Sequence, residues 1–408
     1  MTTVENAQAQ LACNGGVPVR PGPMPRWPHF DADDVAAAQD VLVSGNVNYW
    51  TGDQGRRFER EFAEWAGAPY GVAVANGTVA LEVALAALGI GPGDEVVVPS
   101  ATFIATASAV VARGAVPVVV DVAPDTQCMT AEGVAAAVTE RTRAVIVVHL
   151  AGFPADMPAI LRVTRDNGLR VVEDCAQAHG ARRDGRGVGT FGDVAAWSFC
   201  QDKIMTTAGE GGLITTSDEA LWRRCWELKD HGKSYAALFE RAHPPGFRWV
   251  HESFGTNARM TDVQAAVGRT QLRKLDRWVA TRRAHAAALD DRLKGIPSLR
   301  LPPLVEGTEP AYYRFYLHVR DQLLAPGWNR DRIVAAVQAE GVPCASGGCT
   351  EIYRERAFDS VGRPDRPLPV AAELGRTSLA LLVHPTLSDA DIADSASAVE
   401  KVMYAATV

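Results

Sequence analysis

The chain has 408 residues, of which 47% are hydrophobic and 22% charged, enough for a full apolar core and, at about 100–200 residues per domain, for two domains. The formal net charge is -7 and no run of five like charges occurs, which argues against a nucleic-acid or anionic-membrane surface. The N-terminus, MTTVENAQAQLACNGG, lacks a basic region followed by an apolar one, and no stretch approaches the roughly 20 apolar residues of a membrane helix. These features predict a cytoplasmic protein whose partners are small molecules or other protein chains.

Seven cysteines are scattered along the chain without a CxxC pair. They are Cys13, Cys128, Cys175, Cys200, Cys225, Cys344 and Cys349. Their number is odd and their spacing matches no zinc motif, so we predict neither a disulfide framework nor a metal site. We expect most of them to be small buried side chains.

Between residues 30 and 220, short apolar runs alternate with longer helical patterns. The runs of strand length are Tyr70–Val74, Glu95–Val98, Val116–Val120, Ala144–Val148, Leu169–Val172 and Ala195–Phe199. Helices are expected over Thr78–Leu88 and Ala155–Asn167, where apolar residues recur at helical spacing. Nearly unbroken apolar strands separated by helices predict an α/β domain with a mostly parallel sheet covered on both faces.

A long, partly amphipathic helix is expected between about Gly255 and Leu293. Beyond it, the elements predicted at Tyr316–Val319, Asp331–Glu340 and Asp389–Val402 indicate a smaller α+β domain. We therefore expect an N-terminal arm (residues 1–30), a large α/β domain (residues 31–265) and a small C-terminal domain (residues 266–408).

One glycine-rich string, GVGTFG at residues 187–192, matches the GxGxxG pattern of dinucleotide-binding sites. Such a site requires the string to follow a strand and to open a helix. Here it follows ARRDGR and precedes a strand-like AAWSF. We therefore interpret it as a loop and reject a nicotinamide cofactor.

Three other positions carry candidate chemistry. Asp174 ends the apolar run LRVVED, at the strand end where open parallel sheets bind ligands. Ala75–Thr78 joins a strand to a helix with small residues, which suits a phosphate at a helix N-terminus. Lys203 lies between a strand and a glycine cluster, where loss of solvation favours the neutral, nucleophilic amine.

Each position also has a simpler structural role. Asp174 could cap a helix or form an ion pair, Thr78 could be an ordinary helix N-cap, and Lys203 could extend to the surface. Together, however, a phosphate site, a carboxylate for a protonated pyridine nitrogen and a lysine for an imine match pyridoxal phosphate.

The sequence resembles the DegT-type sugar aminotransferases, which are pyridoxal-phosphate enzymes of fold type I. Seven ordered motifs carry the resemblance over nearly the whole chain: SGNVNYWTGDQGRRFEREFA, NGTVAL, PSATFIATASAV, VEDCAQAHGA, GDVAAWSFCQDKIMTTAGEGG, GTNARMTDVQAAVG and HPTLSDADI. It implies a large domain with a mostly parallel sheet, as in aspartate aminotransferase, and a small C-terminal domain.

The resemblance also implies roles for individual residues. Lys203 would hold the cofactor as an imine and move a proton, while Asp174 would keep the pyridine nitrogen protonated. Ring contacts are implied for Gln177, which would hydrogen-bond the phenolic oxygen, and for Ala176 and Phe103, which would cover the two faces. The phosphate would be bound by Gly77, Thr78, Ser198 and, from the partner subunit, Asn257, so a homodimer with shared sites is implied.

The resemblance favours amination of a keto sugar or keto cyclitol, with glutamate or glutamine as donor. A subset of the family has histidine in place of the lysine and performs deoxygenation, so Lys203 favours transamination. The alternatives are a dehydratase that uses the same cofactor and a non-catalytic cofactor-binding protein. Val342–Phe358 departs from the histidine-containing segment of many nucleotide-sugar enzymes, which keeps a cyclitol or an unusual ketose open as acceptor.

The acceptor contacts are predicted from aromatic and polar side chains. Tyr49 and Trp50 in NVNYW, and Tyr313 and Arg314 in YYR, suit stacking and hydrogen bonding to a sugar, a nucleotide or a ring polyol. The same side chains could instead cover domain edges. His231 is also expected near the substrate, and Glu210 is expected to line the site; neither has an assigned role in proton transfer.

Overall fold

A computed structural model describes residues 7–407, and the first six residues of the predicted arm lie outside this range. Its centre is a seven-stranded sheet. The strand order is β1 (Tyr70–Val74), β9 (Gly212–Thr216), β8 (Val194–Ser198), β5 (Arg170–Asp174), β4 (Thr142–Val148), β2 (Glu95–Pro99) and β3 (Val116–Val120). All strands run parallel except β9, which is antiparallel to both of its neighbours.

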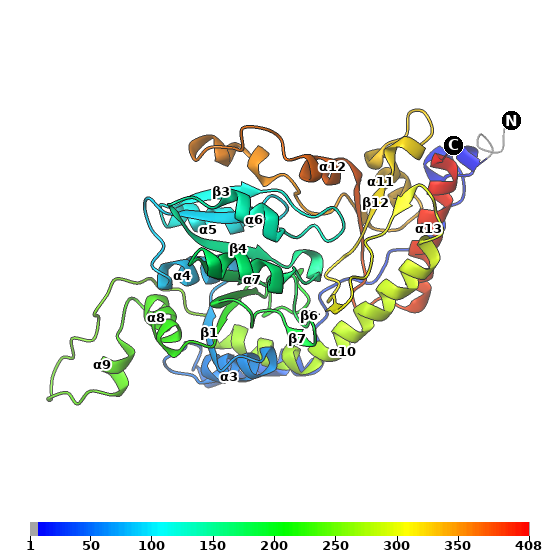
Figure 1. Cartoon of the computed structure of the whole chain (residues 1–408). Coiled ribbons are helices and arrows are strands. Elements are labelled where there is room, and N and C mark those ends of the chain that lie inside the picture. Colours follow the sequence, from blue (N-terminus) through cyan, green and yellow to red (C-terminus); the bar gives the residue numbers. More distant parts are fainter. Residues whose placement is uncertain (1–6, 408) are drawn as a thin grey trace.

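Helices cover both faces of this sheet (Figure 1). One face packs against α4 (Gly77–Ala87), α5 (Ala105–Ala112) and α8 (Glu219–Lys229). The other face packs against α3 (Gln54–Ala66), α6 (Ala131–Ala137), α7 (Met157–Asp166) and α10 (Asp262–Leu293). Successive side chains alternate between these cores, since Val72 and Val74 join the first and Ala73 the second. Burial on both faces explains the nearly continuous apolar strands and confirms the predicted α/β architecture.

The C-terminal region forms a smaller layer. Its antiparallel sheet has the order β10 (Leu299–Arg300), β12 (Phe315–Val319), β14 (Ser378–Leu381) and β13 (Cys344–Ala345). It packs against α11 (Arg330–Ala339) and α13 (Asp389–Ala406), in a core that also takes up Leu11 and Met24 from the N-terminal segment. The helix α10 runs from the large sheet to this region and spans the predicted boundary between residues 265 and 266 (Figure 1).

The remaining elements are short connections, apart from α2, which packs along α10. They are α2 (Ala32–Ser44), α9 (Tyr235–Phe239), α12 (Pro369–Thr377), the strands β6 (Arg182–Arg183), β7 (Arg186–Gly187) and β11 (Thr308–Glu309), and the 3-10 helices η1 (Ala12–Asn14), η2 (Leu150–Gly152), η3 (Asp321–Leu323), η4 (Ile352–Arg354) and η5 (Arg356–Ser360). No helix within residues 7–407 is long and apolar enough to cross a membrane. All seven cysteines are free thiols, four of them buried.

Two helix starts differ from the prediction because polar caps decide them. The side chain of Asn76, not that of Thr78, accepts a hydrogen bond from the first turn of α4. The long helix begins at Asp262 instead of near Gly255, because Thr261 and Gln264 form a capping box there. Strand β9 was not predicted, since its sequence GLITT directly follows the glycine cluster.

The string at residues 187–192 opens no helix, as predicted: Gly187 ends β7, and residues 188–192 form a loop that surrounds a buried carboxylate. Glu173 accepts hydrogen bonds from the backbone N–H groups of Gly189, Phe191 and Gly192 at 2.7–2.8 Å and lies 3.0 Å from Nε2 of His149. Burial by itself raises the pKa of Glu173, but these donors outweigh it and hold the pKa below its ordinary value of 4.5. The glycine-rich loop therefore binds the buried carboxylate of Glu173 on β5 and does not form a dinucleotide site.

We predict that Glu173→Gln lowers the free energy of unfolding by about 3 kcal/mol at pH 7, because the amide leaves the ring of N–H donors without its charge. The folded pKa is depressed, so the carboxylate stabilises the fold above about pH 4.5 and this contribution is lost as the pH falls through the folded pKa. Urea unfolding followed by tryptophan fluorescence should therefore show a lower free energy of unfolding for Glu173→Gln than for the wild type at pH 7. This difference should become smaller at acid pH.

The matched control is Glu140→Gln, since Glu140 is exposed in a loop. It should unfold like the wild type at every pH. A Glu173→Gln protein with an unchanged free energy of unfolding at pH 7 would contradict the proposed stabilising role of the Glu173 carboxylate.

Candidate active site

A cavity of about 870 Å³ opens at the carboxyl ends of the central strands, where parallel sheets bind ligands. Its walls come from the start of α4, the ends of β5 and β8, the loop after β8 and the C-terminal region. Of the predicted site residues, the cavity brings together Gly77, Thr78, Phe103, Asp174, Ala176, Gln177, Ser198, Lys203, Tyr313 and Arg314, with Glu210 beside them.

Lys203 lies in the turn that follows β8. Its backbone N–H donates to the carbonyl of Cys200 at 3.0 Å, and its own carbonyl accepts from the indole N–H of Trp27 at 2.8 Å. Its Nζ lies 3.4 Å from a carboxylate oxygen of Asp202 and 5.0 Å from the centre of the Tyr313 ring. Hydrogen bonds of both its N–H and its carbonyl thus fix the backbone of Lys203, and its amine lies at the cavity wall.

Asp174 presents a buried carboxylate to the same cavity, at the end of β5. It accepts hydrogen bonds from the backbone N–H of Ala176 at 3.1 Å and from the hydroxyl of Thr106 at 3.0 Å. Burial raises the pKa of Asp174 above its ordinary value, although these two donors and the charge of Lys203 act in the opposite direction. A buried carboxylate without a full counter-charge suits a cationic ring nitrogen.

The start of α4 forms a cradle for an anion. The first N–H groups of a helix have no partner within the helix, and Gly77 and Thr78 line the cavity there. A Cβ atom on Gly77 would lie only 2.7 Å from the Cβ of Ser198, so glycine allows α4 to approach β8. The two hydroxyls of Thr78 and Ser198 complete a donor set that fits a phosphate.

The predicted ring contacts lie between the cradle and the amine. Phe103 is 69% exposed, and its ring is available to a ligand rather than packed in the core. The side-chain oxygen of Gln177 accepts from the N–H of Ala151 at 2.7 Å, which leaves its amide nitrogen as a donor. The residues present therefore fit pyridoxal phosphate at the nitrogen, the ring and the phosphate.

Four predicted residues do not line this cavity. Tyr49 is 3% exposed and its hydroxyl donates to Glu59, so the structure corrects its predicted contact with the acceptor to a place in the aromatic core. The indole N–H of Trp50 donates to Asp230 at 2.7 Å, outside the cavity. His231 and Asn257 are exposed in the segment between α8 and α10, away from the cavity of their own chain.

Two site features were not predicted. Thr106 lies within the motif PSATFIATASAV but was not singled out, although a hydroxyl one turn after Phe103 is a usable signal. Asp202 accepts a hydrogen bond from the Tyr313 hydroxyl. Burial raises the pKa of Asp202, but the charge of Lys203 and the Tyr313 hydroxyl outweigh it, so its pKa lies below the ordinary value.

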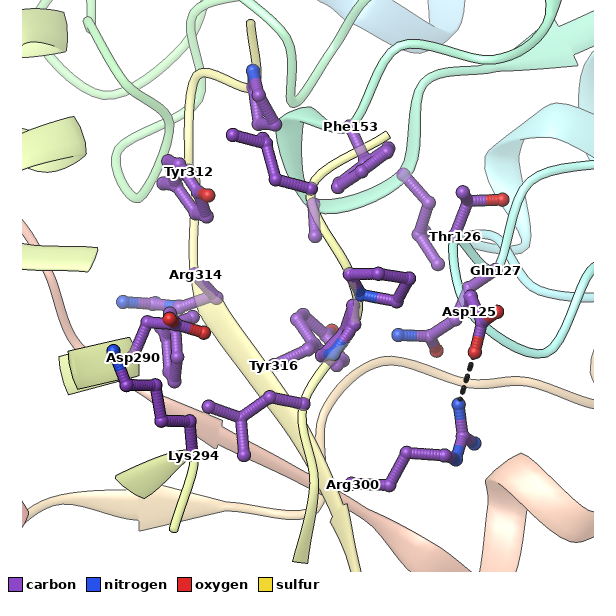
Figure 2. Close-up of a pocket in the computed structure, with 18 of the residues that line it drawn as sticks. Asp125, Thr126, Gln127, Phe153, Asp290, Lys294, Arg300, Tyr312, Arg314 and Tyr316 are labelled. Atoms are coloured by element: carbon purple, nitrogen blue, oxygen red, sulfur yellow. Dashed lines mark hydrogen bonds and ion pairs between the residues drawn. The ribbon is translucent and has the colours of Figure 1, made fainter. Parts of the chain in front are cut away.

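Figure 2 shows a second cavity, of about 480 Å³, between the large and small regions. It shares Leu150, Arg314 and Tyr316 with the larger cavity. Arg300, one of several cationic side chains that line it, is paired with Asp125 at 2.9 Å. It contains neither Lys203 nor Asp174 and so offers no second cofactor site.

We predict that Gly77→Ala weakens binding of pyridoxal phosphate by about 10- to 100-fold, because the added methyl group would push α4 away from β8. The dissociation constant can be measured by absorbance titration of the apoprotein. Gly91→Ala is the control, since a Cβ there meets nothing within 4 Å. Equal affinities of the two variants for pyridoxal phosphate would contradict the predicted phosphate site at the start of α4.

Comparison with known proteins adds to this geometry. The model of the DegT/DnrJ/EryC1/StrS aminotransferase family matches residues 28–400. A UDP-N-acetyl-3-dehydro-alpha-D-glucosamine 3-aminotransferase from Acidithiobacillus ferrooxidans is 38% identical over 375 residues, covering 90% of this chain and 95% of the relative. An L-glutamine:2-deoxy-scyllo-inosose aminotransferase from Streptomyces fradiae is 38% identical over 419 residues, covering 96% and 97%. The solved structure of an aminotransferase from Psychrobacter cryohalolentis is 50% identical with a TM-score of 0.91, covering 93% of this chain and 98% of that one.

Proposed function

This chain belongs to the DegT/DnrJ/EryC1/StrS aminotransferase family, whose enzymes depend on pyridoxal phosphate, and we propose that it transfers an amino group from glutamine or glutamate to the keto group of a sugar or cyclitol. The observation that carries the proposal is the single cavity lined by Lys203, Asp174 and the start of α4. The printed activities of the relatives support the acceptor class, and glutamine appears as donor in several of their names.

The residues of the cavity divide the chemistry among them. Bound there, pyridoxal phosphate supplies an electron-withdrawing ring that stabilises negative charge on the carbon next to the nitrogen. Asp174 would hold the proton on the pyridine nitrogen, and Gly77, Thr78 and Ser198 would bind the phosphate. The Nζ of Lys203 would take the proton from the amine-bearing carbon of the donor and later deliver one to the carbon of the acceptor.

A lysine at position 203 favours amination over the deoxygenation expected of family members that carry histidine at this position. Donor and acceptor must use the same cavity in turn, since both react next to Lys203. This arrangement predicts ping-pong kinetics. The proposed acceptor is either a nucleotide-linked sugar or a free cyclitol. The proposed role is in amino-sugar or aminocyclitol antibiotic biosynthesis, and the proposed location is the cytoplasm.

We also propose that the protein is a homodimer with shared sites. The segment between α8 and α10 projects from the subunit (Figure 1) and exposes the aromatic side chains of Phe247, Trp249 and Phe254. Exposed apolar groups of this kind favour contact with another subunit. Asn257 follows in the same segment and would reach the phosphate in the partner's cavity. A monomer in sedimentation velocity at micromolar concentration would contradict this part.

The experiment that tests the function uses the purified protein loaded with pyridoxal phosphate. Glutamine or glutamate should change its visible absorbance, and a panel with UDP-N-acetyl-3-dehydro-glucosamine and 2-deoxy-scyllo-inosose should yield an amine detected by mass. A protein that fails to take up the cofactor would rule the proposal out. Cofactor uptake without any amine product would favour a dehydratase or a non-catalytic role.

A further inference from the structure

The carboxylate of Asp174 has a protein donor on each of its oxygens. Its Oδ1 accepts the backbone N–H of Ala176 at 3.1 Å, and its Oδ2 accepts the hydroxyl of Thr106 at 3.0 Å. Two donors on different oxygens fix the rotation of the carboxylate about its last bond. The lone pairs that these bonds do not use are left for a ligand in the cavity, which Asp174 and Thr106 both line.

The hydroxyl of Thr106 is itself in contact with a second hydroxyl. The Oγ1 atoms of Thr102 and Thr106 lie 2.7 Å apart. A hydroxyl group has one proton to donate, and Thr106 donates its proton to Asp174. Thr102 is therefore the donor of the second bond, and the two hydroxyls form a relay from Thr102 through Thr106 to Asp174. In such a relay each hydrogen bond polarises and strengthens the next.

The relay is shielded from solvent. Thr106 is 1% exposed, Thr102 3% and Asp174 6%. Water therefore cannot take the place of a missing donor. A buried carboxylate that loses a hydrogen bond under these conditions loses stability relative to its protonated form.

The groups around Asp174 act on its charge in opposite directions. Burial is the largest influence and raises the pKa of Asp174, whereas the N–H of Ala176, the hydroxyl of Thr106 and the charge of Lys203 lower it, in that order. His149, which follows β4, also favours the ionised form, and Cys175 is a neutral thiol because burial raises its pKa. The relay is thus one of the few features that offset the burial of this carboxylate.

An ordinary role within a helix does not account for the hydroxyl of Thr106. This residue lies in the first turn of α5, and a threonine inside a helix commonly bonds to a carbonyl three or four residues earlier. Here the contact four residues earlier is the side chain of Thr102, and the proton is donated across to β5. The same segment carries Phe103, whose exposed ring lines the cavity. One short segment thus supplies a predicted ring contact and a donor to Asp174.

We propose that Thr106, supported by Thr102, is a positioning residue that keeps the Asp174 carboxylate charged and oriented for the ring nitrogen of pyridoxal phosphate. The inference rests on the proposed function, since it requires that nitrogen to lie at Asp174. Asp174 can hold a proton on the ring nitrogen only while it is itself ionised. The relay extends toward acid pH the range in which this condition is met.

The test is the affinity of the apoprotein for pyridoxal phosphate as a function of pH, measured by absorbance titration. In Thr106→Val the decline of affinity on acidification should lie about one pH unit higher than in the wild type, because valine removes the donor to the carboxylate. At pH values above both declines Asp174 is ionised in both proteins, and the affinities should agree within about threefold. Thr106→Ser keeps the hydroxyl and should follow the wild type. Thr102→Val should shift the decline in the same direction by less than about half as much.

Two controls separate this role from a general effect on packing. Thr164→Val is the matched variant, since Thr164 is equally buried in α7 and donates to the carbonyl of Leu161. Its affinity should follow the wild type at every pH. In an Asp174→Asn background, Thr106→Val should cause no further shift, because the group through which it acts no longer titrates.

Three results would overturn the positioning role. They are an unchanged decline in Thr106→Val, an equal loss of affinity at every pH, and a shift that persists in the Asp174→Asn background. If Thr106→Val does not fold, Thr102→Val decides, since it removes the first donor of the relay and leaves Thr106 in place; an unshifted decline there would overturn the role. A wild-type protein that takes up no pyridoxal phosphate would overturn the proposed function itself.

Discussion

Replacement of Lys203 by alanine should lower the rate of amino transfer by at least about 10⁴-fold, because the proposal gives the Lys203 amine two tasks: it holds the cofactor and it moves the proton. None of the other described side chains that line the cavity offers an amine to take over either task. The fold should survive, since the side chain lies at the wall of a cavity and not in the core. Single-turnover absorbance with glutamine measures the rate, and thermal unfolding checks the fold.

The control for Lys203→Ala is Lys294→Ala, which removes an exposed lysine that pairs only with Asp291. It should keep full activity. Methylamine added to Lys203→Ala should restore part of the rate, because a free amine can move the proton that the missing side chain moved. A Lys203→Ala protein with near wild-type turnover would remove the basis of the proposed function.

Asp174→Asn should lower turnover by about 10²- to 10⁴-fold, since the amide has no charge to hold a proton on the ring nitrogen. It should also weaken cofactor binding. The raised pKa of Asp174 means that the wild-type carboxylate becomes protonated at a higher pH than an ordinary aspartate. The affinity of the wild type for pyridoxal phosphate should therefore decline as the pH falls through that pKa, and this decline should be absent in Asp174→Asn.

The apoprotein provides the contrasting measurement. Burial disfavours the ionised form of Asp174, so the carboxylate opposes folding at neutral pH, where it is charged. Apo Asp174→Asn should unfold at the same temperature as the wild type or at a higher one, while it loses activity. The exposed Asp166→Asn is the control and should change neither property. A large loss of apoprotein stability in Asp174→Asn would contradict this account.

The sequence predicted the central strands well and for a physical reason. Tyr70–Val74 and Val116–Val120 have the same bounds in the structure, because apolar runs in a sheet covered on both faces have clear ends. Strand β9 contains two threonines and was missed. It is buried because it pairs with β1 on one side and β8 on the other, which only the tertiary structure determines.

The candidate site could be predicted where chain order determines it. Asp174 ends β5 and Lys203 follows the neighbouring strand β8, so the rule for carboxyl ends of parallel strands places them at one edge. The bond between Tyr313 and Asp202 joins residues 111 positions apart, and no local pattern encodes it. Tyr49 looked like a surface aromatic residue, but Trp226 and Lys229 from a distant helix bury it.

The N-terminal segment has a consequence for how the chain is synthesised. Trp27 donates to the backbone of Lys203 and packs edge-on against Trp278, and its ring is stacked with His384. Leu11 lies in a core completed by residues as late as Ala406. The segment around Leu11 is synthesised before α13, so it can take its native place only when α13 has been made. The backbone of Lys203 is thus secured late in folding, and a chain without α13 has no finished cavity wall.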